Sequence, residues 1–414
     1  MNSRDYVRGS KPDRIHTEKL ILETSKILER RTEAVIRHYV ENCDECGIPI
    51  ELCDRILPVP FAFRKLSQSA KTEMVMSPVF QYWLKAARRC TDSNYSSQRL
   101  DVLEQLPSVG WMTLALEGIL DFPLVTKLDS LGGLRCSPIG SFIEFGAHSA
   151  AMVCQIDPVA DGEVRVEVSG NERRFSVSDL AHGKEKTGVY NPPHLIGGIE
   201  LSSRDDFLCA AFTGTLQRHD GVEFFGVARE QYQATPDIGV YDKAIEIAQS
   251  TWEDGFEEIR AFTNVVVPRV GTPEEHICFT VSSRQGAIFL DPLDPIELIE
   301  NIVHETAHVK LRCIQFFDPI IKDTEDDERR FKVAWRKDKR PLTGILEGCY
   351  VFMHVAEIVR ALNEKGIKET YSNLEQLKID VGSAISVLTE NATFTELGND
   401  FIHDLLGWRD EVFP

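Results

Sequence analysis

One helical segment constrains this chain more than any other: the HETAH motif of residues 304–308, which lies inside the apolar run 295–311. Residues four apart share one face of a helix, so His304 and His308 can bind a single metal ion while Glu305 lies beside it. The flanking isoleucine, valine and leucine residues predict a deeply packed helix. Polar side chains in such surroundings are costly unless a metal or hydrogen bonds satisfy them. The motif therefore predicts a buried metal-binding helix.

Composition narrows the class of protein. The chain has 414 residues, 43% of them hydrophobic, and a formal net charge of −19, which argues against nonspecific binding to nucleic acid. The N-terminus has no apolar signal segment, and there is no run of 18 or more apolar residues. The ten cysteines are mostly scattered, as in a reduced compartment. We therefore expect a cytoplasmic protein without a membrane span.

Periodicity predicts an α+β fold that is mainly helical, with a β-containing middle. Predicted strands followed directly by the HExxH helix resemble the zincin arrangement, which implies a zincin-like HExxH metal domain. Helical spacing dominates residues 1–130, interrupted near Ser77-Pro78. Short alternating or β-branched runs within 131–235 predict strands, assigned to peptide recognition. Residues 236–414 form the expected catalytic domain, with a long helix over 238–263, three strands, and Asp294 as N-cap of the HExxH helix.

A third metal ligand is expected on a second apolar helix near residues 344–357. Glu347, Tyr350 and His354 are spaced to share a face there, and Glu347 is the preferred ligand, with His354 in reserve. Two histidines and a carboxylate describe either a zinc peptidase site, in which Glu305 acts as general base, or the facial triad of a non-haem iron(II) oxygenase. Cys43 and Cys46, followed by Cys53, form a weaker zinc pattern because a second CxxC pair is missing.

A cationic segment, residues 334–344, separates the two helices. Its Arg336 and Arg340 are suited to bind a dicarboxylate through paired hydrogen bonds, or else to neutralise Glu347, Asp338 or Glu305. The charge run at 322–332 predicts a solvated loop or a lid.

The C-terminal half resembles the HExxH-containing peptide-modification proteins of ribosomally made, post-translationally modified peptides, a family of 2-oxoglutarate-dependent peptide β-hydroxylases. The resemblance rests on SSRQGAIFL (282–290), VHETAHVKL (303–311), Trp335-Arg336, Arg340-Pro341-Leu342 and the GILEG segment (344–348), and more weakly on residues 76–83. The family pattern commonly has a histidine where this chain has Glu347.

What the resemblance implies is hydroxylation, expected at Cβ, of a side chain in a precursor peptide during natural-product biosynthesis. Iron(II), held by His304, His308 and Glu347, would use 2-oxoglutarate and dioxygen, with Arg336 or Arg340 on the cosubstrate. Glu305 would then act from outside the ligand set. A zinc metallopeptidase that uses Glu305 as general base is the alternative, and a non-catalytic peptide-binding module is the third hypothesis.

Overall fold

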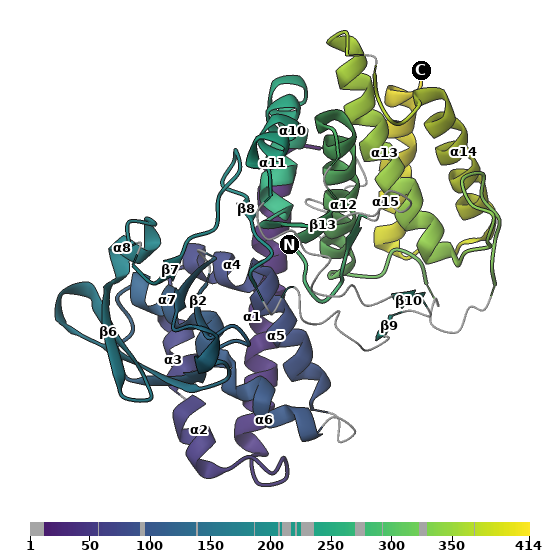
Figure 1. Cartoon of the computed structure of the whole chain (residues 1–414). Coiled ribbons are helices and arrows are strands. Elements are labelled where there is room, and N and C mark those ends of the chain that lie inside the picture. The colour runs from purple at the N-terminus through teal and green to yellow at the C-terminus, as the bar shows by residue number, and fades with distance from the viewer. Residues whose placement is uncertain are drawn as a thin grey trace.

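A computed structural model describes the chain in the ranges 12–56, 58–91, 96–137, 140–185, 187–205, 208, 217–219, 222–224, 236–269, 278–291, 293–322, 329–367 and 369–414. Figure 1 shows an N-terminal region of helices and small sheets beside a C-terminal region dominated by long helices. The mixture of helices with separate sheets confirms the α+β class.

The N-terminal region is helical, as its amphipathic pattern predicts. Its helices are α1 (Arg14–Glu41), α2 (Ile50–Ile56), α3 (Pro58–Lys65), α4 (Gln68–Met76), α5 (Pro78–Arg89), α6 (Ser96–Glu104) and α7 (Leu106–Leu116). The break predicted near Ser77 and Pro78 is confirmed, because the Ser77 hydroxyl accepts a hydrogen bond from the Phe80 amide at 3.3 Å and caps α5. Helix α1 packs against α11 (Glu253–Phe262) and α12 (Pro295–Gln315) of the C-terminal region, so the two regions share one core.

The middle of the chain forms two antiparallel sheets, with strand orders β1-β4-β5-β6 and β2-β3-β7. Their strands are β1 (Leu124–Lys127), β2 (Gly133–Cys136), β3 (Ser141–Glu144), β4 (Val153–Pro158), β5 (Glu163–Val168), β6 (Asn171–Ser176) and β7 (Val189–Tyr190), with the short helices η3 (Ala147–Ser149), η4 (Ala160–Gly162) and α8 (Val177–Ala181). Strand β5 alternates as predicted, because Val164, Val166 and Val168 are buried and the residues between them are charged.

A third sheet supports the HExxH helix. Its order is β12 (Phe279–Thr280), β13 (Ala287–Leu290), β11 (Val265–Pro268) and β8 (Glu200–Leu201). Strand β11 runs parallel to β8 and β13, whereas β12 pairs antiparallel with β13 at one edge. Strands β11 and β13 are buried at every position, as expected for strands covered on both faces. A separate pair, β9 (Gln217–His219) with β10 (Val222–Phe224), completes the described strands.

The helices of the C-terminal region are α10 (Ile238–Thr251), α11 (Glu253–Phe262), α12 (Pro295–Gln315), α13 (Leu342–Glu364), α14 (Leu374–Asn391) and α15 (Glu396–Val412). The single helix predicted over 238–263 is wrong. Trp252 leaves the helical conformation (φ −146°, ψ 75°), and its ring lies so close to Gly255 that a Cβ there would meet it at 2.1 Å. Two shorter helices follow from that local packing.

The predicted domain limits do not coincide with the sheets. Strand β1 lies within the expected helical region 1–130 but pairs with β4, and β8 lies within 131–235 but pairs with β11. Apart from Leu208, the apolar run at 207–212 lies outside the described residues, as does most of the charge run at 322–332.

Among the described residues, one helix, α13, is long and apolar enough to cross a membrane by length and composition alone. Of its most apolar window, 72% is buried inside the fold, which is typical of the core helix of a globular protein. Its apolar surface is therefore accounted for by packing within the chain.

Two glycines of α15 offer a test of the C-terminal packing. A Cβ on Gly398 would lie 1.9 Å from the backbone carbonyl oxygen of Ile320, whereas a Cβ on Gly407 would meet nothing within 4 Å. We expect Gly398→Ala to lower the free energy of unfolding by about 1–3 kcal/mol or more, because backbone must move. Gly407→Ala should instead raise it by up to about 1 kcal/mol through helix propensity. Denaturant unfolding of both variants measures this, and equal effects would contradict the packing.

Candidate metal centre

The HExxH motif lies in the middle of α12, beside β13 in Figure 1. Asp294 caps the helix as predicted, since its side chain accepts hydrogen bonds from the amides of Ile296 (3.0 Å) and Glu297 (3.3 Å). The rings of His304 and His308 lie on one face with centroids 5.2 Å apart, inclined at 63°. The i, i+4 spacing therefore brings the two imidazoles together.

Both imidazoles are held in the neutral form. Burial lowers the pKa of His304 to about 4, although 33% of its side-chain surface is still exposed. The pKa of His308 lies well below its usual value because of burial first, and then because of the His304 and Arg312 charges. Among the described residues, the buried Nδ1 of His308 has no hydrogen-bond partner. Neutral imidazoles with an unsatisfied ring nitrogen fit metal ligands, since coordination would satisfy that nitrogen.

Glu305 points away from solvent, toward the edge strand β12. It is 4% exposed, and burial raises its pKa to about 7, against the opposing effects of the Arg312 charge and of a hydrogen bond with Thr280. Its Oε1 lies 3.9 Å from Nε2 of His304. A carboxyl group with this pKa is able to exchange a proton near neutral pH.

The expected third ligand lies on α13, which packs against α12. Leu298 and Ile302 near the start of α12 cluster with Ile358 and Leu362 near the end of α13, which indicates that the two helices run antiparallel. The His304 ring lies 6.3 Å from that of Phe352. Both helices rise about 1.5 Å per residue. Residue 348, four residues before Phe352 on α13, therefore lies at the level of His308, four residues after His304 on α12.

Glu347 is one residue from that level, half-buried, and already engaged in a polar interaction. No three His, Cys, Asp or Glu side chains form a group arranged to hold a metal ion in the part of the chain that the structure describes. The ligand set His304, His308 and Glu347 therefore stays a prediction.

His354, the reserve ligand, lies in a different cluster. Its Nδ1 donates to the Tyr350 carbonyl oxygen at 3.0 Å, and its Nε2 lies 3.3 Å from Oε2 of Glu258, which also pairs with Lys310. All of these side chains are buried between α11, α12 and α13. Lys310 is two residues beyond His308, so it projects from nearly the opposite side of α12. His354 thus faces a buried ion pair rather than the histidine pair.

The cationic segment, residues 334–344, lies against the N-terminal half of α13. The Trp335 ring packs edge-on against Phe352 with centroids 5.1 Å apart, and a Cβ at Gly348 would meet it at 2.8 Å. Arg336 and Arg340 both pair with Asp338, at 3.0 and 2.9 Å. The pairing with Asp338 is one of the two roles that the sequence left open for these arginines.

Arg312 is a residue of the site that sequence reasoning missed. It continues the ridge of His304 and His308 at the next i+4 step, and its Nη1 donates to the Thr280 hydroxyl at 3.1 Å. The spacing 304, 308, 312 was the available signal. Sequence alone did not show that Thr280 would lie opposite it.

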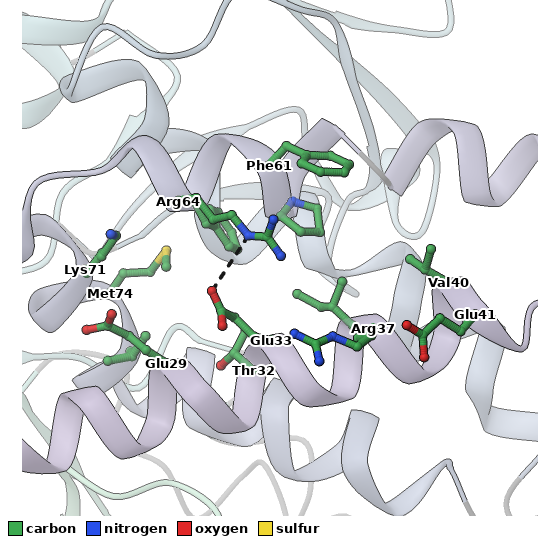
Figure 2. Close-up of a pocket in the computed structure, with 14 residues that line it drawn as sticks. Glu29, Thr32, Glu33, Arg37, Val40, Glu41, Phe61, Arg64, Lys71 and Met74 are labelled. Carbon is green, nitrogen blue, oxygen red and sulfur yellow. Dashed lines mark ion pairs between the residues drawn. The ribbon is translucent and has the colours of Figure 1, made fainter.

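Two other features are separate from this centre. Cys43, Cys46 and Cys53 are free thiols, and Cys46 Sγ lies 3.9 Å from Nε2 of His38 without completing a metal group within the described residues. A groove of about 460 Å³ lies between α1 and α3, where Arg64 pairs with Glu33 at 3.7 Å (Figure 2). It is lined by both signs of charge and does not border the histidines.

Comparison with known proteins does not assign this chain to a family. No protein-family model matches the sequence, and no curated protein matches it significantly.

Proposed function

We propose that this protein is an iron(II)- and 2-oxoglutarate-dependent hydroxylase that modifies a side chain, at Cβ, in a ribosomally made precursor peptide. The observation that carries the proposal is the contact chain from His304 to Phe352 to Trp335. It links the segment that carries two arginines, through Trp335 and Phe352, to a pair of half-buried, neutral imidazoles. A metal chelated by a dicarboxylate needs imidazole ligands for the metal and a nearby cation for the distal carboxylate.

His304, His308 and Glu347 would hold the metal, and the resemblance to the HExxH peptide hydroxylases supports iron. When bound, iron(II) with 2-oxoglutarate and dioxygen supplies the oxidising power for an unactivated C–H bond. The protein's own contribution is to keep both imidazoles unprotonated through burial. Glu305 would orient a ligand or water from beside the metal.

Strand β12 supports a peptide as substrate. It is the edge of its sheet, paired only with β13 among the described strands, and it lies against α12. Its Thr280 contacts side chains on the face of α12 that carries the histidines. An extended peptide pairing with this edge would run past the metal, as in the zincin arrangement.

The zinc metallopeptidase is the second candidate, because one observation favours it. Glu305 is buried with a pKa of about 7, as suits a general base that activates metal-bound water. This candidate gives no role to a dicarboxylate. The third hypothesis, a non-catalytic peptide-binding module, differs from both because it predicts no tightly bound metal.

Glu305→Gln separates the two enzyme classes. In a hydroxylase, the variant should keep its metal and keep forming oxidised peptide and succinate. In a peptidase, cleavage should fall by roughly 10²–10⁴-fold, because the base that deprotonates water is lost. Mass spectrometry of a candidate precursor peptide, after incubation with iron-loaded or zinc-loaded protein, reports addition of an oxygen atom or a cut.

Glu297→Gln, on the first turn of the same helix, is the matched control and should behave as the parent. Cleavage by the parent protein loaded with zinc without oxygen would contradict the hydroxylase. Loss of all metal from purified parent protein under iron-replete or zinc-replete dialysis would instead favour the binding module.

A further inference from the structure

A small pocket of about 150 Å³ lies at the junction of the N-terminal and C-terminal regions. Its walls come from the start of α5, from strands β2 and β8, from the loop before β8 and from the end of α11. The hydroxyl of Thr263 in this wall shares a hydrogen bond of 2.8 Å with that of Thr306, the central residue of the HExxH motif. Thr306 lies two residues from each histidine, so it projects from nearly the opposite side of α12. The pocket is therefore separate from the metal centre.

Glu200 of β8 lines this pocket with a carboxylate that is incompletely satisfied. The residue is 6% exposed, and its buried Oε1 has no hydrogen-bond partner among the described residues. Its Oε2 lies against the turn at Gly140, where φ is +70° and a Cβ would meet that oxygen at 2.1 Å. Burial raises the pKa of Glu200, and the charges of Arg135 and His194 oppose this only in part. Such a group is costly to bury unless a donor completes it.

Arg135 of β2 lines the same pocket and has an unused donor. It is 5% exposed, its Nη1 pairs with Asp205, and its guanidinium lies 5.4 Å from the centre of the Phe142 ring. Its buried Nε has no hydrogen-bond partner in the part of the chain that the structure describes. The pocket thus combines an acceptor on Glu200 that lacks a donor with a donor on Arg135 that lacks an acceptor.

The rest of the lining offers less to a ligand. The buried hydroxyls of Ser77 and Thr263 are already hydrogen-bonded, and the remaining charged side chains are exposed to solvent, namely Glu73, His194 and Arg260. Bridging water alone does not account for the size of the pocket. One water needs roughly 10–15 Å³ of such space, so the volume admits a molecule of several non-hydrogen atoms.

A molecule that completes both buried groups must present a charged donor and a charged acceptor close together. An α-amino acid carries an ammonium group and a carboxylate on one carbon atom, and charge-assisted hydrogen bonds of this kind are stronger than neutral ones. We propose that this pocket binds a small α-amino acid as a zwitterion, with its ammonium group donating to Oε1 of Glu200 and its carboxylate accepting from Nε of Arg135. The proposal does not depend on the hydroxylase function.

Isothermal titration calorimetry of the parent protein at fixed ionic strength, with glycine and L-alanine as probes, tests the proposal. A Kd of about 0.1–10 mM is expected for ligands of five or six non-hydrogen atoms. Methylammonium and acetate each offer one of the two charged groups, so each should bind at least about tenfold more weakly than glycine. Because the walls come from both regions, glycine should also raise the Tm of the parent protein.

Glu200→Gln should weaken glycine binding about tenfold or more, because the amide accepts from the ammonium group without an opposite charge. Glu246→Gln, in the exposed pair with Lys243 on α10, is the matched control and should bind glycine as the parent does. Arg135→Lys gives a second variant, since a point charge on a shorter reach does not reproduce the guanidinium. The comparison of glycine with methylammonium and acetate needs no variant, so it holds even if neither substitution folds.

Three outcomes would overturn the proposal. The first is no binding of glycine or L-alanine to the parent protein at concentrations about tenfold above the expected Kd range, which would mean that the pocket holds water only. The second is binding of methylammonium or acetate as tight as that of glycine. The third is a folded Glu200→Gln protein that binds glycine as the parent does.

Discussion

His304→Ala is expected to leave the protein without stoichiometric metal and without turnover. Two of the proposed ligands come from α12, and removal of one leaves a site with too few donors to hold the ion. The fold should survive, because the imidazole is partly exposed and its burial favours only the neutral form. Metal analysis of the purified variant, together with its circular dichroism spectrum and thermal unfolding, measures both expectations.

His182→Ala is the control for the loss of a histidine. His182 lies at the end of α8, where its Nδ1 donates to the Ser178 carbonyl oxygen at 2.6 Å, far from the centre in sequence and on an exposed surface. This variant should keep the metal content of the parent. Stoichiometric metal in His304→Ala would remove the HExxH pair from the ligand set and, with it, the proposed function.

Glu258→Gln should cause the largest loss of stability of the variants considered. Glu258 is 2% exposed and pairs with Lys310 and His354, which are themselves buried. The amide would leave the Lys310 ammonium without an opposite charge in the core, at a cost of about 3–5 kcal/mol. Denaturant unfolding measures it. Glu246→Gln, in the exposed pair with Lys243 on α10, should cost less than about 1 kcal/mol.

A second substitution checks the physical reason. When Lys310→Met is added to Glu258→Gln, the unpaired charge disappears, so much of the lost stability should return. A double variant no more stable than Glu258→Gln would mean that shape, rather than charge, determines the effect. The metal content of the double variant then reports whether this cluster also positions α12.

Acidification offers an independent check of the same cluster. Burial raises the pKa of Glu258, but Lys310 and His354 lower it further, so its pKa in the folded protein lies below the usual value of 4.5. A group of this kind contributes stability above its unfolded pKa and loses it as the pH falls through the folded pKa. The difference in unfolding free energy between parent and Glu258→Gln should therefore be full at neutral pH and shrink below about pH 4.5. A difference that grows on acidification would contradict the assignment.

Local sequence patterns predicted the elements that their own residues determine. Helix α12 begins at its predicted cap, because Asp294 bonds amides two and three residues away. Strand β5 alternates as its valines predict. The long helix over 238–263 failed because Trp252 packs on Gly255, a contact that helical periodicity does not represent.

The sequence by itself determined the histidine pair: a regular helix necessarily aligns residues four apart, so His304 and His308 meet whatever surrounds them. Only the tertiary structure decided what the other candidates do. His354 shares an apparent face with Glu347, yet its Nε2 lies beside Glu258 of α11, which also pairs with Lys310 of α12. Arg336 and Arg340 form ion pairs with Asp338, and Arg312 donates a hydrogen bond to Thr280 on the edge strand β12. Asp338 is only two residues from each of its arginines, so that pairing was among those the sequence offered. Glu258 and Thr280, in contrast, come from elements that meet α13 and α12 only when the core packs, and no local spacing encodes those contacts.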